Sequence, residues 1–406
     1  LIDAGDIYLG AYAGWYAVRD EAFYGEDELT TGADGKKTAP SGAEVEWVEE
    51  PSYFFKLSAW EDRLLKFYDD NPNFILPKTR RNEVTSFVKG GLQDLSVSRT
   101  TFNWGVPVPG DDDHIMYVWL DALTNYITAV GYPETESVEY ARYWPADLHM
   151  VGKDILRFHA VYWPAFLMAA GLEAPKRVFA HGWWTNEGQK ISKSVGNIID
   201  PIDLVNTYGL DQVRYFLLRE VPFGNDGDFS QRAMVNRMNG ELANDYGNLA
   251  QRVLSMINKN CEARVPEPGA FTADDEALLG QARGLLADIR TKIDVQSFHE
   301  VLEAIWVVIR AANGYVDAQA PWKLKKEDPP RMATVLYVLG ETIRQLAVLT
   351  QPFMPQTSNV LLDQLSQGAD QRDFAAAGPD AQPLESGLEL PKPEGAFPRF
   401  VEEEGG

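Results

Sequence analysis

Residues 147–184 carry the sequence DLHMVGKDILRFHAVYWPAFLMAAGLEAPKRVFAHGWW, and this stretch decides the fold. Residues 147–151 have the short apolar pattern of a buried strand, and a helix is expected over 152–170. Gly171 ends that helix, and residues 177–180 are predicted to form a further strand. A strand, a helix and a second strand in this order are typical of an α/β fold with a doubly wound parallel sheet.

The same alternation extends toward the N-terminus. Residues 115–120 form a compact apolar run that predicts a strand, followed by a helix over 121–130. In doubly wound sheets, ligands bind beyond the carboxyl ends of the strands. The segments that follow Leu120, Val151 and Ala180 are therefore the expected ligand-binding positions.

The two flanks of this region differ in character. The N-terminal flank is loop-rich, with short strands and a helix expected over 58–69, which is typical of an inserted subdomain. After Asn225 the strands disappear, and apolar residues at near-heptad spacing predict an α-helical bundle. The bundle helices are expected over 231–258, 299–316 and 331–349. From about Gly368 the chain is rich in Ala, Pro, Gly and Glu, which predicts a loose C-terminal tail.

Composition indicates a globular protein of several domains. The chain has 406 residues, of which 45% are hydrophobic and 24% charged. No apolar run of bilayer-spanning length and no signal peptide is recognised, and the single Cys261 excludes an internal disulfide or a cysteine-based zinc knuckle. A reducing cytoplasm is the expected location. The net charge of −23 on its own argues against nucleic-acid binding, although local patches and exposed RNA loop bases can still be recognised.

The strongest chemical signal is the loop Lys190-Ile191-Ser192-Lys193-Ser194. Two lysines three residues apart can hold polyphosphate charge that develops as a phosphorus–oxygen bond breaks. A helix is expected just after it, with Asp200 as N-cap and Pro201 at the first position. Taken alone, such a loop is more often a solvated surface turn.

The context of the loop indicates a family. The loop follows a strand that ends at His181-Gly182, and in this position it resembles the Lys-Met-Ser-Lys-Ser signature of class I aminoacyl-tRNA synthetases. Three further segments resemble methionyl-tRNA synthetases in sequence and order, namely Met116-Tyr-Val-Trp-Leu-Asp-Ala122, Val151-Gly-Lys-Asp-Ile155 and Tyr315-Val-Asp-Ala-Gln-Ala-Pro-Trp322. The resemblance extends from near Leu1 to about Pro355.

The resemblance implies a class I catalytic domain, incomplete at its N-terminus, with an inserted connective subdomain and a helical anticodon-binding bundle. The implied domains are the connective insert (1–103), the second half of the catalytic nucleotide-binding domain (104–230), the bundle (231–367) and the tail (368–406). The implied activity is ATP-dependent formation of methionyl-adenylate and transfer of methionine to the 3′ end of tRNA(Met), including the initiator tRNA. Mg²⁺ is expected to accompany ATP.

The resemblance also assigns candidate site residues. Methionine binding is implied for Trp119, Ala122, Tyr126, Asp154, Ile155, His159 and Trp163. ATP binding is implied for Gly152, Asp154, His181, Gly182, Trp184 and Lys193, and the catalytic loop residues are Lys190, Ser192 and Lys193. Without the family, core packing would be the preferred explanation for the aromatic residues, and His159 could equally be a core histidine.

Anticodon recognition is implied for Asn248, Arg252 and Trp322. Asn248 and Arg252 are i and i+4 on one helix face, and Trp322 offers a platform on which an unstacked base can lie. The competing interpretation is an exposed amphipathic helix and a tryptophan packed in the core. The lysines that follow Trp322, at 323, 325 and 326, are expected to meet phosphates.

Four departures from the family are recognised, and three of them lead to further expectations. None of the five histidines belongs to a His-Ile-Gly-His signature, so a chain beginning at Leu1 is expected not to activate methionine alone. Residues 15–21 lack the cysteines that bind zinc in many relatives, which predicts a zinc-free insert, and Leu123 stands where some relatives have proline. Nothing after the bundle resembles a dimerisation domain, which favours a monomer. Because no apolar run of bilayer-spanning length is recognised, membrane binding is not expected.

Two alternatives remain open at this stage. One is another class I synthetase, specific for leucine, isoleucine, valine or cysteine, although the insert is short for an editing domain. The other is a non-catalytic tRNA-binding protein derived from a synthetase. The intact loop from Lys190 to Ser194 argues against the second alternative.

Overall fold

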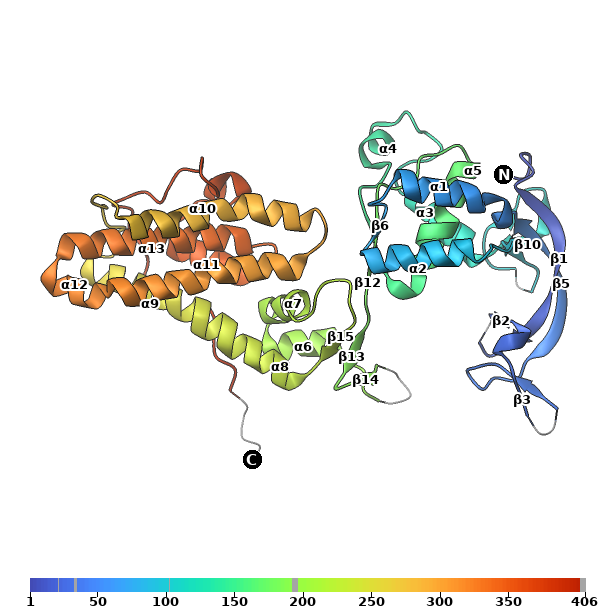
Figure 1. Cartoon of the computed structure of the whole chain (residues 1–406), viewed down its shortest axis with the longest axis horizontal. Coiled ribbons are helices and arrows are strands. Elements are labelled where there is room, and N and C mark those ends of the chain that lie inside the picture. Colours follow the sequence, from blue (N-terminus) through green and yellow to red (C-terminus); the bar gives the residue numbers. More distant parts are fainter. Residues whose placement is uncertain (21, 33–34, 102, 192–195, 402–406) are drawn as a thin grey trace. The chain divides into compact units, whose positions relative to one another are not determined.

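The computed structural model describes residues 1–20, 22–32, 35–101, 103–191 and 196–401. The chain forms two compact units, Leu1–His181 and Gly182–Gly406, and each is considered separately here (Figure 1). These units divide at a different place from the boundaries predicted at residues 103 and 230. The difference arises because the N-terminal segment packs into the same core as the strand–helix–strand region.

Two antiparallel sheets of three or more strands lie in the described part of the N-terminal unit. The larger has the order β2-β1-β5-β7 and consists of β2 (Ala22–Tyr24), β1 (Ile7–Ala17), β5 (Glu46–Phe55) and β7 (Leu95–Ser96). Its long β1–β5 ribbon pairs from Ile7↔Phe55 to Tyr16↔Glu46. A second sheet has β10 (Asp111–Met116) between β8 (Ser98–Arg99) and β9 (Pro107–Val108). The small hairpin β3 (Thr30–Thr31) and β4 (Lys37–Thr38) and the turn η1 (Glu26–Glu28) complete this part.

The parallel sheet is the centre of the unit. Among the described residues it has the order β11 (His149–Gly152), β12 (Val178–His181) and β6 (Ile75–Leu76). The pairing of β11 with β12 is parallel, as the sequence predicted. Strand β6 lies within the predicted insert, yet it pairs in parallel with β12. The insert therefore does not extend unbroken to residue 103.

Helices cover the parallel sheet. They are η2 (Leu57–Trp60), α1 (Glu61–Asp70), α2 (Lys78–Lys89), α3 (Val118–Thr128), α4 (Val138–Tyr143), η3 (Lys153–Ile155), the π-helix η4 (Phe158–Tyr162) and α5 (Trp163–Ala169). Tyr68 of α1, Val84 of α2 and Leu123 of α3 share one buried core with Val151 and Val178 of the sheet. This shared core is the physical reason why the unit includes the predicted insert.

The prediction of a strand over 115–120 was partly wrong. Strand β10 ends at Met116, it pairs antiparallel with β8, and helix α3 already begins at Val118. Short apolar runs do not distinguish a strand from a buried helix by periodicity alone. Leu120 therefore belongs to a helix and does not end a strand of the parallel sheet.

The C-terminal unit begins with a small sheet of β13 (Trp184–Asn186), β14 (Gln189–Lys190) and β15 (Gly227–Phe229), followed by helices. The helices are α6 (Pro201–Tyr208), α7 (Leu210–Arg219), α8 (Gln231–Asn236), the π-helix η5 (Arg237–Gly247), α9 (Asn248–Asn260), α10 (Ala273–Ile293), α11 (Phe298–Gln319), α12 (Pro321–Glu327), α13 (Pro329–Thr350) and α14 (Pro355–Gln364). As predicted, Asp200 caps α6, since its carboxylate accepts a hydrogen bond from the Ile202 amide at 2.7 Å.

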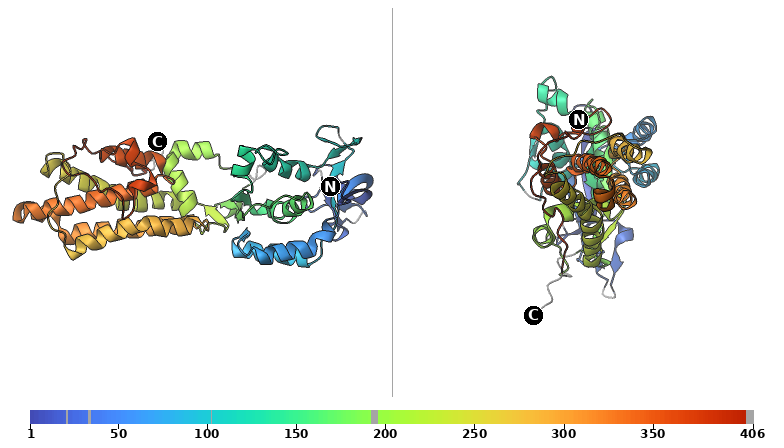
Figure 2. Two further views of the ribbon diagram at one scale, coloured as in Figure 1. Left: turned by 90° about the horizontal axis from the view of Figure 1, so that it is seen from above. Right: turned by 90° about the vertical axis from the view of Figure 1, so that its left-hand side faces the viewer.

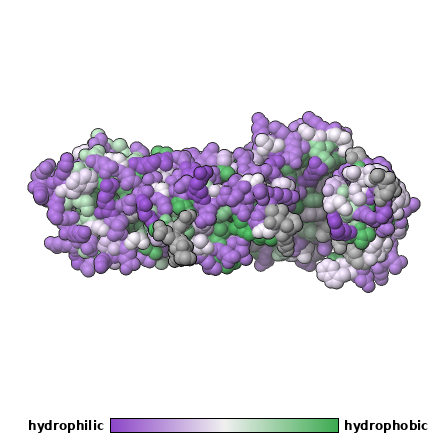
Figure 3. Space-filling model, turned by 90° about the horizontal axis from the view of Figure 1, so that it is seen from below, coloured by the Kyte–Doolittle hydropathy of each residue, from purple (hydrophilic) through white to green (hydrophobic). Residues whose placement is uncertain are grey.

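The bundle predicted after Asn225 is confirmed. Helices α10, α11 and α13 lie side by side, as both Figure 1 and Figure 2 show. The bundle face visible in Figure 3 is mainly hydrophilic. Among the described residues, α13 alone is long and apolar enough to cross a membrane, which the sequence analysis had missed, but 94% of that stretch is buried.

The prediction of a loose tail was wrong for residues 368–401. Leu384, Leu390 and Phe397 are at most 7% exposed and belong to the core of the bundle. The Leu384 amide donates to Oε2 of the buried Glu341 at 2.9 Å, and η6 (Ala369–Gln371) and η7 (Phe374–Ala376) add short helical turns. Widely spaced apolar side chains without periodicity escape pattern analysis, but they fill grooves between helices once the bundle has formed.

Candidate functional site

An aromatic group lies where the methionine-binding residues were predicted. Trp119 and Tyr126 project from α3, and the Trp119 ring stacks on Phe158 of η4 with centroids 3.6 Å apart. Tyr126 faces His159 at 5.6 Å and Trp163 at 6.3 Å. The structure thus brings residues from α3, η4 and α5 into one aromatic cluster. A slot of this kind suits a polarisable thioether.

A chain of two hydrogen bonds runs through the cluster. The Tyr126 hydroxyl lies 2.8 Å from Nε2 of His159, and Nδ1 of His159 lies 2.9 Å from the carbonyl oxygen of Ile155. Because that carbonyl only accepts, Nδ1 carries the proton and Nε2 accepts the bond from Tyr126. Burial lowers the pKa of His159, which keeps the imidazole neutral. The predicted residues Tyr126, Ile155 and His159 therefore form one oriented unit.

The remaining predicted methionine residues differ in exposure. Ala122 is exposed on α3, where it lies one helical turn from Tyr126. Trp163 is 2% exposed, and its indole nitrogen has no hydrogen-bond partner among the described residues. Asp154 is exposed at the end of β11. Asp154 lies in η3, directly after β11 and one residue before Ile155.

Sequence analysis missed His149, which belongs to the same cluster. Its ring lies 4.2 Å from Tyr126 and 6.0 Å from His159. Burial and the neighbouring His159 lower the pKa of His149 to about 4, and Nε2 of His149 has no hydrogen-bond partner within the described structure. The sequence did not single out His149, because it reads as one of two inward-facing residues, with Val151, of a short buried strand.

Gly152, Asp154 and His181 come together at the carboxyl ends of two neighbouring strands. Gly152 of β11 pairs with His181 of β12. A Cβ atom at Gly152 would lie 2.4 Å from Oδ1 of Asp154 and 3.8 Å from Cε1 of His181. Only glycine therefore leaves room for the Asp154 carboxylate to fold back over the strand end. This edge is where a doubly wound sheet is expected to bind a nucleotide.

The other predicted ATP residues, Gly182 and Trp184, belong to the C-terminal unit. A Cβ atom at Gly182 would lie 2.2 Å from the carbonyl oxygen of Asn225, so the backbone approach there requires glycine. The Trp184 ring is half-buried, with Phe216 at 5.8 Å. Trp184 thus packs partly as a core residue.

The base of the predicted catalytic loop is well defined. Lys190 ends β14, is exposed, and its Nζ lies 5.8 Å from the centroid of the Trp183 ring. Asp228 supports this hairpin by accepting hydrogen bonds from Thr185 at 2.6 Å and from the Gly188 amide at 2.8 Å. These bonds lower the pKa of Asp228, with Thr185 as the main cause. Ser192 and Lys193 lie outside the described residues.

The predicted anticodon residues lie on the bundle. Asn248 is exposed at the start of α9, and Arg252 follows one turn later on the same helix. The guanidinium of Arg252 contacts Asp317 at 3.2 Å and the Asn313 amide oxygen at 3.5 Å. Trp322 of α12 is 45% exposed, so it is not the core-packed tryptophan of the competing interpretation.

No group of three or more His, Cys, Asp or Glu side chains is arranged to hold a metal ion in the described part of the chain. In the predicted zinc-free region, Trp15 packs edge-on against Trp47 at 5.4 Å, and Lys37 lies 4.2 Å above the Trp15 ring. Aromatic packing is thus present in the region for which the sequence predicted a zinc-free insert.

The chain is similar to known proteins along nearly its whole length. Residues 1–254 match the family model "tRNA synthetases class I (M)", and residues 265–405 match "Anticodon binding domain of methionyl tRNA ligase". The methionine–tRNA ligase of Brucella melitensis is 60% identical over 402 residues, which are 99% of this chain and 78% of that protein. The corresponding ligase of Mycobacterium tuberculosis H37Rv is 57% identical over 401 residues, which are 98% of this chain and 77% of that protein. The solved structure of M. tuberculosis methionyl-tRNA synthetase in complex with methionyl-adenylate superimposes with a TM-score of 0.93 at 56% identity, covering 98% of this chain and 78% of that one.

Proposed function

The chain belongs to the methionyl-tRNA synthetases, which are class I aminoacyl-tRNA synthetases, and we propose that the aromatic cluster around Tyr126 and His159 binds the side chain of methionine. The activity of the family is activation of methionine with ATP to methionyl-adenylate, followed by charging of tRNA. The roles of individual residues in this activity are the proposal developed below.

The observation that carries the proposal is the hydrogen-bonded chain from Tyr126 through His159 to the Ile155 carbonyl. Both ring nitrogens of His159 are engaged, so the imidazole presents a fixed, neutral edge to the slot. A neutral wall built from Trp119, Tyr126 and Trp163 favours an uncharged thioether over a charged side chain. In this scheme the exposed carboxylate of Asp154 binds the ammonium group of methionine at the mouth of the slot.

ATP is proposed to bind at the strand ends formed by Gly152, Asp154 and His181, and roles in ATP binding are likewise proposed for Gly182 and Trp184. The methionine carboxylate attacks the α-phosphate in line, and pyrophosphate leaves. Lys190 and Lys193 stabilise the negative charge that develops on the phosphates, and Ser192 belongs to the same loop. This mechanism depends on positioning and charge, and it needs no nucleophile from the protein. Mg²⁺ is proposed to arrive with ATP.

On the bundle, Asn248, Arg252 and Trp322 are proposed to read the anticodon of tRNA(Met), including the initiator. The exposed Trp322 ring offers a stacking surface, and Arg252 a planar cation that Asp317 and Asn313 hold in position. Lys323, Lys325 and Lys326 lie next to Trp322 and are proposed to contact backbone phosphates. A zinc-free insert, a monomeric state, a cytoplasmic location and the absence of membrane binding stay predictions from the sequence.

The proposal is tested by methionine-dependent exchange of labelled pyrophosphate into ATP, with leucine, isoleucine and cysteine as controls. For the full-length enzyme, the exchange is expected with methionine and with none of the three control amino acids. Asp154→Asn is expected to raise KM for methionine, because the charge that faces the ammonium group is lost. An Asp154→Asn enzyme with unchanged KM would remove Asp154 from the proposed site.

A further inference from the structure

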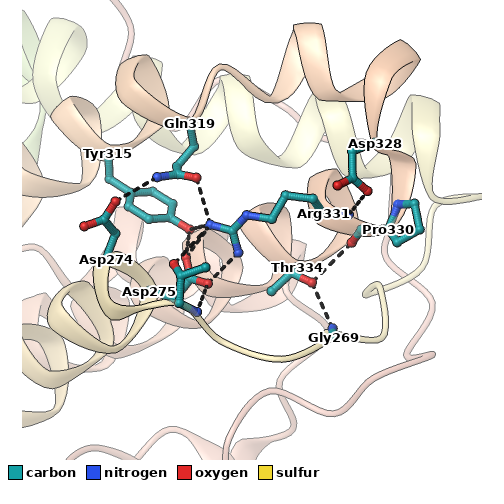
Figure 4. A network of polar contacts seen from close by, with 10 residues as sticks. Gly269, Asp274, Asp275, Tyr315, Gln319, Asp328, Pro330, Arg331 and Thr334 are labelled. Atoms are coloured by element: carbon teal, nitrogen blue, oxygen red, sulfur yellow. Dashed lines mark hydrogen bonds and ion pairs between the residues drawn. The ribbon is translucent and has the colours of Figure 1, made fainter.

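A buried cluster of polar side chains lies on the bundle next to α12, the short helix that carries Trp322 (Figure 4). Its centre is Asp275 of α10, whose side chain is fully buried. Arg331 of α13 binds both carboxylate oxygens, with Nη2 at 2.7 Å from Oδ1. The Tyr315 hydroxyl of α11 donates to the same Oδ1, and the Thr272 amide donates to Oδ2 at 2.8 Å. One carboxylate thus joins three helices of the bundle.

The cluster also links the residues just before α12 to those just after it. Gln319 is the last residue of α11, and its amide oxygen accepts a hydrogen bond from Nη2 of Arg331 at 2.8 Å. Arg331 lies in the first turn of α13, where its amide is capped by Asp328 at 3.1 Å. The segment 320–330, which contains α12, is therefore a loop whose two ends are fastened to each other and to Asp275.

Helix α12 has few anchors of its own. It has seven residues and starts after Ala320, which has the left-handed backbone conformation at φ 45°. Pro321 is buried and Leu324 packs partly against the core, while Trp322 is 45% exposed. A helix this short is not stable without tertiary contacts. The fastened ends of the segment, together with Pro321 and Leu324, therefore hold the helix that carries Trp322.

At neutral pH, Asp275 and Arg331 form an ion pair. Burial disfavours the charge of Asp275, but hydrogen bonds from Arg331, Tyr315 and Thr272 outweigh burial and lower the pKa of Asp275 to about 2. The carboxylate is therefore ionised at neutral pH. Removing one partner of a buried pair leaves the other charge uncompensated, so the geometry depends on both.

We infer that Asp275 and Arg331 are positioning residues for anticodon recognition, because they hold the ends of α12 and thereby orient Trp322. The inference rests on the proposed function of Trp322. Asp275 acts through Trp322, and the site it serves is a stacking platform for a base in an unpaired RNA loop. Its loss affects tRNA recognition and leaves methionine activation intact.

The test is a double-mutant cycle on the full-length enzyme. Asp275→Asn keeps the shape of the side chain and removes its charge, and Trp322→Ala removes the platform. Each variant and the double variant are assayed for KM of tRNA(Met) in aminoacylation, for discrimination against a tRNA with an altered anticodon, and for pyrophosphate exchange. Glu341→Gln is the matched control, because Glu341 is also buried and paired with an arginine, Arg344 at 2.7 Å, but supports the C-terminal segment.

Asp275→Asn is expected to raise KM for tRNA about tenfold, the scale of a displaced base-stacking platform, and to weaken anticodon discrimination. Pyrophosphate exchange should stay unchanged, and the double variant should be no worse than Trp322→Ala alone, because both act on the same contact. Glu341→Gln should lower the thermal stability of the bundle without changing KM for tRNA.

The remaining outcomes distinguish failure of the positioning role of Asp275 from failure of the anticodon role of Trp322. If Trp322→Ala raises KM for tRNA while Asp275→Asn does not, the positioning role is refuted and the anticodon site stands. If Asp275→Asn and Glu341→Gln raise KM equally, or if the double variant shows additive losses, the effect is general loosening and the positioning role is again refuted. If Trp322→Ala has no effect on KM for tRNA, the proposed anticodon role of Trp322 is refuted together with the inference.

Discussion

Replacing Tyr126 with phenylalanine removes one oxygen atom from the centre of the proposed methionine slot. The hydroxyl donates to Nε2 of His159 at 2.8 Å, and His159 is only 2% exposed. In Tyr126→Phe this buried acceptor has no donor. An unsatisfied buried polar group costs roughly 1–3 kcal/mol. The ring of phenylalanine keeps the packing against His149 and Trp163, so the loss is confined to the hydrogen bond.

The effect on methionine binding follows from the same bond. Without the hydroxyl, the edge of His159 is held only through Nδ1 and the Ile155 carbonyl. A loss of about 1.4 kcal/mol in binding corresponds to a tenfold rise in KM. We expect KM for methionine to rise about tenfold with little change in kcat, because the slot binds the side chain equally in the ground and transition states.

The assay is pyrophosphate exchange at varied methionine, together with urea unfolding of each variant. Tyr337→Phe is the control, since the buried Tyr337 hydroxyl donates to the Leu384 carbonyl at 3.0 Å within the bundle. That variant should lose comparable stability and keep its KM for methionine. The reasoning is refuted if Tyr126→Phe is destabilised but binds methionine normally, or if Tyr337→Phe shows the same rise in KM.

Four further predictions concern the loop, a buried histidine, the C-terminal segment and metals. Lys190→Ala should lower kcat of pyrophosphate exchange roughly a hundredfold and leave KM for methionine unchanged. The reason is that the lysine stabilises negative charge that develops only in the transition state. A change in KM without a change in kcat would contradict this role. The pKa of His149 is about 4 in the folded state and about 6.5 in the unfolded state, so the unfolded state binds the proton more readily. The free energy of unfolding therefore keeps the full contribution of neutral His149 above pH 6.5. It loses about 3 kcal/mol as the pH falls from 6.5 toward 4. Urea unfolding between pH 7.5 and 4.5 should show this fall in the free energy of unfolding, and the fall should be smaller in His149→Gln. An equal fall in the variant would mean that other groups cause it. Leu384→Ala should lower the free energy of unfolding by about 2–5 kcal/mol because a buried side chain leaves a cavity, and a change well below 1 kcal/mol would mean that the tail is not part of the core. A zinc-selective chelator should leave pyrophosphate exchange intact whereas excess EDTA stops it by removing Mg²⁺, and inactivation by the zinc chelator would overturn the zinc-free insert.

Much of the candidate site could be predicted from the sequence because its signals are local. The alternation over 147–180 indicated parallel pairing of β11 with β12, which the register His149↔Val178 confirms. The spacing of Asn248 and Arg252 placed both on one helix, and α9 contains both. The glycine at 152 and the acid at 154 follow a strand end, which is where the structure brings Gly152, Asp154 and His181 together.

Other parts of the site had no local signal. His149 reads as an ordinary strand residue, and only the packing of α3 against β11 brings Tyr126 to 4.2 Å from it. Neither hydrogen bond of His159 was visible in the sequence, although one partner, Ile155, is four residues away. The partner of Asp275 is Arg331, 56 residues later, and no spacing rule links the two.

By itself, the sequence determined the family and several helices, among them those over 299–316 and 331–349, and it proposed the types of residue at the candidate site. Helix periodicity, capping residues and short motifs are properties of a few consecutive residues, so they survive without knowledge of the fold. Only the tertiary structure decided that β6 joins the parallel sheet, that residues 384–397 enter the core of the bundle, and which buried polar groups pair. These outcomes depend on groups that lie far apart in the chain and meet only when apolar surfaces are buried together. Burial also makes an unpaired polar group energetically costly, so the buried polar groups must find partners.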